Sequence, residues 1–115
     1  MAVTIYHNPR CSKSRQTLEL LEARGLEPEV VDYLKTPPDA AAIERILTLL
    51  GLEPRALMRI KETAYRDNHL DDPGLTRQQL IDALVRHPQL LERPVVVANG
   101  KAAIGRPPEN VLEIL

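Results

Sequence analysis

Residues 2–32 read AVTIYHNPRCSKSRQTLELLEARGLEPEVVD, and this stretch decides the fold. It opens on a short β-branched run that His-Asn-Pro interrupts, which is typical of a strand ending in a loop. Between residues 12 and 24 leucines recur at helical spacing among good helix formers, and Gly25 follows where a helix C-cap is expected. Residues 29–32 then predict a second strand around two valines. Strand, helix and strand within about 30 residues indicate a parallel crossover.

The middle of the chain predicts helices. Asp39 can cap a helix with one apolar face that Gly51 ends, and another helical stretch begins near Arg55. Thr76 is expected to cap a third stretch, which His87-Pro88 ends.

The end of the chain predicts a hairpin and a final helix. Short apolar runs at 94–98 and 102–104 flank Asn99-Gly100, a strong signal for a two-residue turn. Arg-Pro-Pro at 106–108 then opens a last helix. The predicted order is therefore β-α-β, helices, β-β-α.

The composition indicates a folded domain and argues against several functions. The chain has 115 residues, 43% hydrophobic and 27% charged, which is ordinary for one globular domain. Its net charge of -1 and its 3 tyrosines, without phenylalanine or tryptophan, offer little to a nucleic acid. We expect no membrane span because no stretch of about 18 apolar residues occurs. No spacing of His, Cys, Asp or Glu suggests a metal site, and no glycine-rich loop suggests a nucleotide.

Cys11 is the one cysteine, so it cannot form a disulfide within the chain, and a reducing cytoplasm is the expected compartment. It stands at the expected start of the first helix, where free N–H groups favour negative charge. Arg10, Lys13 and Arg15 surround it in sequence, so we expect a thiol pKa below the free value of about 8.5. The alternative is that a lone cysteine is a small buried hydrophobe.

The residues after the cysteine narrow the chemistry. Ser14 stands where a dithiol oxidoreductase has its resolving cysteine, so a second thiol must come from another molecule. Thr17 stands where a tyrosine phosphatase loop requires arginine, which argues against phosphatase chemistry. Arg15 lies four residues after Cys11, so both can face one ligand from the same side of a helix.

Five segments together resemble the ArsC family of glutaredoxin-coupled arsenate reductases, and within it the short YfgD-like branch. They are IYHNPRCSKSRQTLELL at 5–21, YLKTPP at 33–38, RALMR at 55–59, LERPVVV at 91–97 and GRPP at 105–108. The resemblance covers nearly the whole chain in order. It implies one α/β domain over residues 1–115 with a thioredoxin-like fold and a helical insertion, about 39–90, between the second and third strands.

The resemblance also implies roles for individual residues. Cys11 matches the nucleophile, and His7 matches a residue that tunes its thiolate. Pro94 matches a cis-proline that closes the site. The residues expected to bind the oxyanion are Arg59, Arg93 and Arg106, with Ser14 and Arg15 contributing from the cysteine loop.

The implied activity is the reduction of arsenate to arsenite through a covalent Cys11 adduct. Glutathione would be the co-substrate, glutaredoxin the partner, and no cofactor or metal would be bound. Two alternatives stay open. One is a glutathione-dependent thiol transferase acting on another substrate. The other is a regulator that binds RNA polymerase, similar to Spx proteins, although these usually carry a second cysteine where this chain has Ser14.

Overall fold

A computed structural model describes residues 2–115, and the chain divides into two compact units. The first unit contains the described residues up to Thr36 together with Arg93–Leu115. The second unit is Pro37–Glu92. The second unit spans the region for which a helical insertion is predicted, while the grouping of both units into one domain stays a prediction. Among the described residues no helix is long and apolar enough to cross a membrane.

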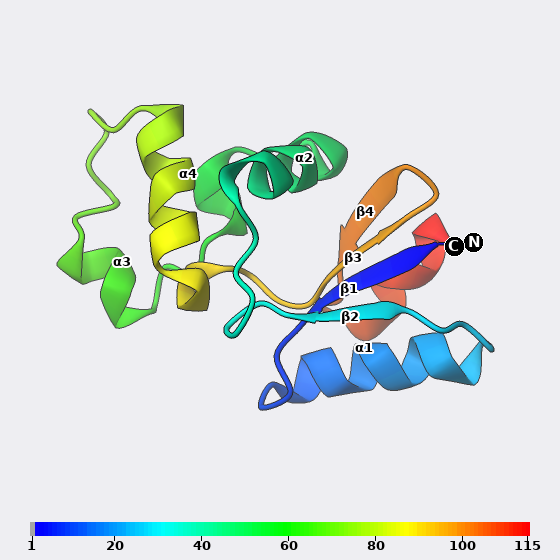
Figure 1. Ribbon diagram of the computed structural model, residues 1–115. Coiled ribbons are helices and arrows are strands. Elements are labelled where there is room, and N and C mark those ends of the chain that lie inside the picture. Colours follow the sequence, from blue (N-terminus) through cyan, green and yellow to red (C-terminus); the bar gives the residue numbers. More distant parts are fainter. Residues whose placement is uncertain (1) are drawn as a thin grey trace. The chain divides into compact units, whose positions relative to one another are not determined.

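The first unit is built on a four-stranded sheet in the order β2-β1-β3-β4 (Figure 1). Strand β1 pairs in parallel with β2 and antiparallel with β3, and β3 pairs antiparallel with β4. The strands are β1 (Val3–His7), β2 (Glu29–Asp32), β3 (Val95–Ala98) and β4 (Lys101–Ile104). The predicted β-α-β unit and hairpin are confirmed, with Asn99 and Gly100 at φ of 56° and 69° in the turn.

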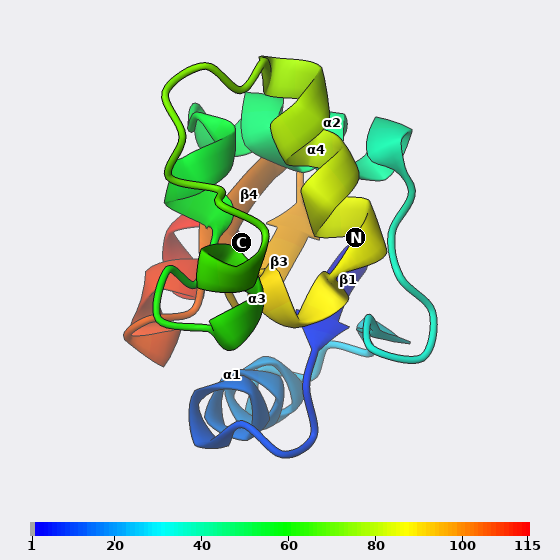
Figure 2. The same cartoon turned by 90° about the vertical axis from the view of Figure 1, so that its left-hand side faces the viewer.

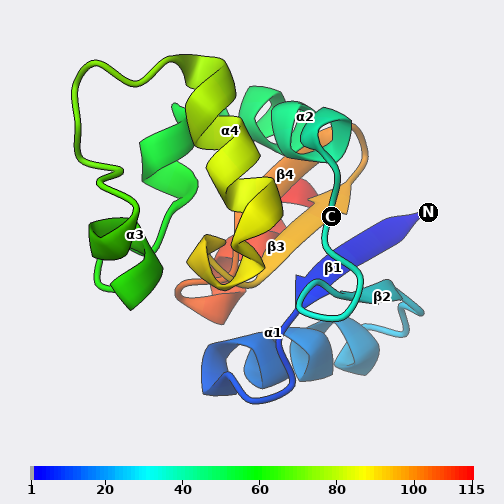
Figure 3. The same cartoon turned by 60° about the vertical axis from the view of Figure 1, so that its left-hand side comes forward.

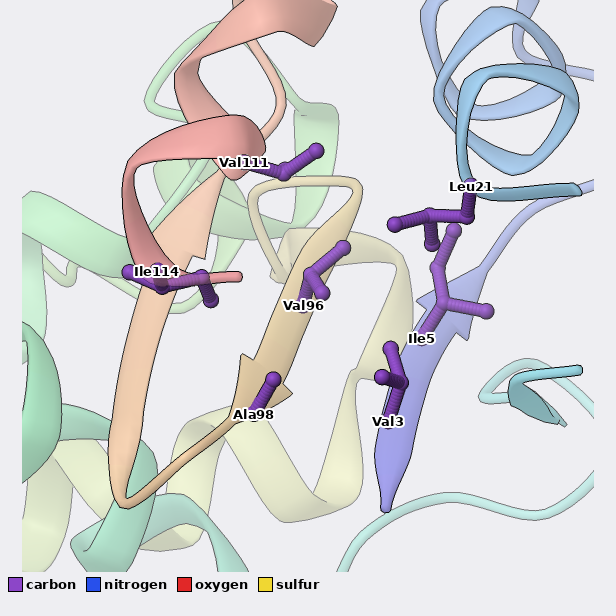
Figure 4. Packing of buried hydrophobic residues seen from close by; sticks show 7 residues of the cluster. All are labelled: Val3, Ile5, Leu21, Val96, Ala98, Val111 and Ile114. Carbon is purple, nitrogen blue, oxygen red and sulfur yellow. The ribbon is translucent and has the colours of Figure 1, made fainter. Parts of the chain in front are cut away.

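The core of this unit lies between the sheet and two helical segments, α1 (Ser12–Ala23) and the 3₁₀ helix η3 (Pro108–Ile114). Alternate residues of β1 and β3 form one apolar face, because side chains two apart point to the same side. Val3 is paired with Ala98 and Ile5 with Val96 in the register. Figure 4 shows the helical residues that gather over these pairs, namely Leu21, Val111 and Ile114.

The last segment differs from the prediction, because it is a 3₁₀ helix instead of an α-helix. Val111 and Ile114 are its buried hydrophobic residues, and they lie three positions apart. A 3₁₀ helix has three residues per turn, so this geometry aligns both side chains on the face that packs against the core.

The second unit is helical. Its elements are α2 (Ala40–Leu50), η1 (Pro54–Leu57), α3 (Thr63–Asp67), α4 (Arg77–Arg86) and η2 (Pro88–Leu90). Helices α2 and α4 pack against each other (Figure 2). Both predicted caps are confirmed: Asp39 accepts a hydrogen bond from the Ala42 N–H at 2.8 Å, and Thr76 forms a capping box with Gln79.

Two short segments of this unit differ from expectation. The helical stretch near Arg55 is the single 3₁₀ turn η1, and α3 was not predicted. Helix α3 has five residues and none of them is buried, so it has no apolar periodicity to detect. Arg55 instead supports the chain that joins α3 to α4 (Figure 3), donating to the carbonyl oxygens of Leu70 at 2.8 Å and Asp72 at 2.6 Å.

Gly105 marks a close approach between α1 and the end of the hairpin. A Cβ atom at this position would lie 2.5 Å from Thr17 Oγ1 and 2.8 Å from Pro94 Cγ. The Gly105 N–H donates to the Pro94 carbonyl at 2.9 Å, and Thr17 Oγ1 donates to the Lys13 carbonyl at 2.8 Å. Both sides of the contact are held in place, so only a residue without a side chain fits between them.

We expect Gly105→Ala to lower the free energy of unfolding by about 1 to 3 kcal/mol, the usual cost of overpacking. Urea unfolding followed by circular dichroism measures it. Thr17→Ala removes the nearer obstacle, so the double variant should lose less stability than the two single variants combined. Simple additivity would show that Thr17 does not limit the space.

Candidate active site

The turn from Asn8 to Cys11 carries the cysteine from the end of β1 to the start of α1. The Cys11 N–H donates to the Asn8 carbonyl at 3.0 Å, and the Arg10 N–H donates to Asn8 Oδ1 at 3.0 Å. An Asn side chain that accepts from the backbone two residues later is the usual device of such turns. Cys11 is the N-cap residue of α1 and is half-buried. Its thiol therefore stands where the helix exposes free N–H groups.

Two arginines reach the cysteine from the hairpin. Arg106 Nη2 lies 3.5 Å from Cys11 Sγ, and Arg106 Nε donates to the Arg93 carbonyl at 2.8 Å. Arg93 precedes β3 and Arg106 follows β4, and the antiparallel register pairs the neighbouring residues Val95 and Ile104. The hairpin thus brings together two arginines that are far apart in sequence.

These neighbours stabilise the thiolate. Burial alone raises the pKa of the Cys11 thiol, but the backbone N–H groups of Ser14 and Lys13 and the guanidinium groups of Arg93 and Arg106 outweigh it. The net effect lowers the pKa below its usual range, as the sequence predicts. The cations responsible are the two hairpin arginines, whereas the sequence suggested the side chains next to Cys11. Arg15 instead donates to the Pro9 carbonyl at 2.9 Å and supports the turn.

His7 contacts Ser14, and through this residue it affects the surroundings of the Cys11 sulfur. Its Nδ1 lies 2.6 Å from Ser14 Oγ, which also accepts a hydrogen bond from the Asn8 N–H at 3.0 Å. Burial lowers the pKa of His7, and Arg15 lowers it further, although Asp32 opposes them. A neutral His7 can accept a hydrogen bond from the Ser14 hydroxyl at Nδ1. The imidazole therefore helps to hold the first turn of α1, whose N–H groups face Cys11.

Ser14 and Tyr33 are both completely buried. The Ser14 hydroxyl is engaged with His7 and Asn8, so what it offers toward Cys11 is its backbone N–H. Tyr33 accepts a hydrogen bond from Asn8 Nδ2 at 3.5 Å, and burial raises its pKa although the charge of Arg93 opposes this. No pattern in the sequence reveals the polar contacts of Tyr33. Asn8 was also missed, although Asn-Pro is a known turn signal.

Of the remaining predicted site residues, Pro94 lies in the first unit and Arg59 in the second. The Arg93–Pro94 peptide bond is cis, which confirms that expectation, and the Arg106–Pro107 bond is also cis, which was not predicted. Arg59 belongs to the second unit, where it forms ion pairs with Glu62 at 3.4 Å and Glu92 at 3.6 Å. Its role therefore stays a prediction. Among residues 2–115 no group of three or more His, Cys, Asp or Glu side chains is placed to hold a metal ion.

Comparisons with known proteins agree on one family. The ArsC family model matches residues 6–114. The chain is 60% identical to the uncharacterized protein YfgD of Escherichia coli K12, over 98% of this chain and 96% of that protein. It is 53% identical to an arsenate reductase of Neisseria meningitidis, with 98% and 97% covered. The solved structure of an arsenate reductase from Vibrio cholerae superposes with a TM-score of 0.98 at 53% identity, covering 100% of this chain and 98% of that one. The α/β fold is thus the thioredoxin-like fold that the family resemblance implied.

Arg106→Ala should move the alkylation of Cys11 to higher pH. With iodoacetamide the unchanged protein is expected to reach half its maximal rate below the free-thiol value of about 8.5. The substitution removes a positive charge 3.5 Å from the sulfur, so the half-maximal pH should rise. Arg24→Ala, at the other end of α1, is the matched control. An equal rise in that variant would mean that net charge, and not the contact, sets the thiol pKa.

His7 should make folding stability depend on pH below about 6.5. Its folded-state pKa is lowered from 6.5, so between these values the unfolded chain binds a proton that the folded chain does not. The contribution of His7 to the free energy of unfolding is then fully present above pH 6.5. It falls as the pH drops below 6.5, by at most about 1.4 kcal/mol per pH unit. Comparing urea unfolding of the protein and of His7→Gln between pH 7.5 and 5.5 isolates this contribution. Parallel pH curves would contradict it.

Proposed function

The chain belongs to the ArsC family, and from this premise we propose that it reduces arsenate to arsenite. Glutathione is the proposed co-substrate, and glutaredoxin is the proposed partner that regenerates the Cys11 thiolate. One observation carries the proposal: a thiolate-favouring Cys11 stands 3.5 Å from the Arg106 guanidinium and beside Arg93. Glutathione and glutaredoxin belong to a reducing compartment, so we place the reaction in the cytoplasm.

Arsenate suits this arrangement because it is a tetrahedral polyanion. A guanidinium donates paired hydrogen bonds to two oxygens, and its charge offsets the repulsion between the anion and an attacking thiolate. Arg93 and Arg106 would hold arsenate against Cys11 in this way. Arg59 is included as a third ligand on the family resemblance alone. The exposed Arg15 is assigned to the edge of the site, while Ser14 contributes its N–H and His7 positions the first turn of α1.

The reaction then needs one protein thiol. The Cys11 thiolate attacks arsenic, a sulfur–arsenic bond forms, and one oxygen leaves as water after protonation. The glutathione thiolate attacks the Cys11 sulfur, so a disulfide forms while the electron pair of the sulfur–arsenic bond passes to arsenic. Arsenic is reduced from the pentavalent to the trivalent state and leaves as arsenite. A glutaredoxin thiolate then takes the glutathionyl group and releases the Cys11 thiolate.

An assay of arsenate-dependent NADPH oxidation tests the proposal, coupled through glutathione reductase, glutathione and glutaredoxin. Cys11→Ser should abolish the arsenate-dependent rate. Arg93→Ala and Arg106→Ala should each lower kcat/KM for arsenate by about tenfold to a hundredfold, the usual worth of one charged hydrogen bond. Arg24→Ala, at the end of α1, is the control and should keep its rate.

A different result would point to the other thiol chemistry. If the unchanged protein shows no arsenate-dependent rate while Cys11 still reacts at low pH, arsenate is not its substrate. The same thiolate can accept a glutathionyl group from another disulfide, so a glutathionylated peptide would then be the substrate to try.

A further inference from the structure

A cavity of about 320 Å³ lies beside the turn that carries Cys11. This volume is within the range of small-molecule sites, roughly 300 to 1,000 Å³. Two segments line the cavity: residues 8–10 after β1, and the last residue of β2, Asp32, with Leu34 and Lys35 after it. The strands β1 and β2 are parallel, with His7 opposite Asp32, so both segments leave the sheet at the same edge. Crevices at the carboxyl ends of parallel strands are common ligand sites.

The charged side chains that line the cavity are two cations and one carboxylate. Within residues 2–115 the Arg10 guanidinium and the Lys35 ammonium form no hydrogen bond or ion pair with another residue. The reaction proposed above uses neither of these side chains. The positive charges of Arg10 and Lys35 are therefore available to a ligand in the cavity.

The carboxylate is held in a defined place. Asp32 Oδ1 accepts a hydrogen bond from the Leu34 N–H at 3.3 Å, and the Asp32 carbonyl accepts from the N–H groups of Lys35 at 3.0 Å and Thr36 at 2.8 Å. These bonds close a tight turn that keeps Asp32 and Lys35 next to each other. Such a pair of opposite charges matches the ammonium and carboxylate of an α-amino acid group.

We propose that this cavity binds glutathione. Glutathione carries an α-amino acid group at its γ-glutamyl end, a carboxylate at its glycine end and a thiol between them. Asp32 and Lys35 would hold the α-amino acid group, and Arg10 the glycine carboxylate. Pro9 and the half-exposed Leu34 supply apolar walls for the stems of the peptide. The choice of glutathione rests on the proposed function, whereas the cavity and its charges do not.

The position of the cavity suits the reaction. Arg10 directly precedes Cys11 in the chain. The Cys11 N–H donates to the carbonyl of Asn8, another cavity residue. A tripeptide anchored at both ends would bring its central thiol to the turn, while the arginines hold the oxyanion from the hairpin. Glutathione and arsenate would then reach Cys11 from separate binding sites.

Binding of S-methylglutathione to the Cys11→Ser protein tests this site without arsenate or turnover. In a titration followed by amide resonances, we expect saturable shifts at residues 8–10 and 32–35. Adding Arg10→Ala and Lys35→Ala should raise Kd about three- to tenfold, as expected for two partly exposed ion pairs. Adding Arg24→Ala and Lys101→Ala changes the net charge equally at exposed positions outside the cavity and should leave Kd unchanged.

A second comparison tests the assignment of Asp32. N-acetyl-S-methylglutathione lacks the ammonium group, so it should bind more weakly than S-methylglutathione, and Asp32→Asn should remove this difference. Absence of saturable binding, shifts confined to the region of Arg93 and Arg106, or equal Kd values in both double-cation variants would overturn the site. If the ligand binds as expected but the unchanged protein, with Cys11 intact, shows no arsenate-dependent turnover, only the proposed function is overturned.

Discussion

The hydroxyl of Ser14 joins the end of β1 to the first turn of α1, and the active centre depends on this junction. It accepts a hydrogen bond from the Asn8 N–H at 3.0 Å and lies 2.6 Å from His7 Nδ1. The backbone N–H of the same residue helps to lower the pKa of the Cys11 thiol. One buried residue therefore fixes the strand end, orients the helix start and stabilises the thiolate. A buried network of this kind keeps its geometry because an unmade hydrogen bond would be costly.

The second requirement is that cations reach this helix terminus. The hairpin supplies them, since its antiparallel register places Arg93 and Arg106 at one end and a hydrogen bond of 2.8 Å links them. Gly105 allows the hairpin to approach α1 closely, because a side chain there would meet Thr17 and Pro94. The turn before α1 thus has the arginines of the hairpin near the sulfur and the proposed glutathione cavity beside residues 8–10.

Sequence patterns predicted the elements with strong local signals. Capping residues located the starts of α2 and α4, and Asn99-Gly100 located the hairpin turn, because these signals act within a few residues. The patterns failed at η1, α3 and η3, because each is a single turn or a few turns long and offers too few residues for a periodic signal. Likewise, Cys11 was identified from its position, but the residues assumed to activate it were its neighbours in the chain.

The sequence by itself determined the order of the strands and of the longer helices, the thiol at a helix start and the lack of a second cysteine, because each is a local or compositional property. The family resemblance added Arg93 and Arg106 as candidates. Only the tertiary structure decided that these two side chains lie beside Cys11, that His7 is buried against Ser14 and that Arg10, Asp32 and Lys35 border one cavity. The physical reason is that sheet pairing brings distant strand ends together, and no local pattern encodes the resulting distances and charges.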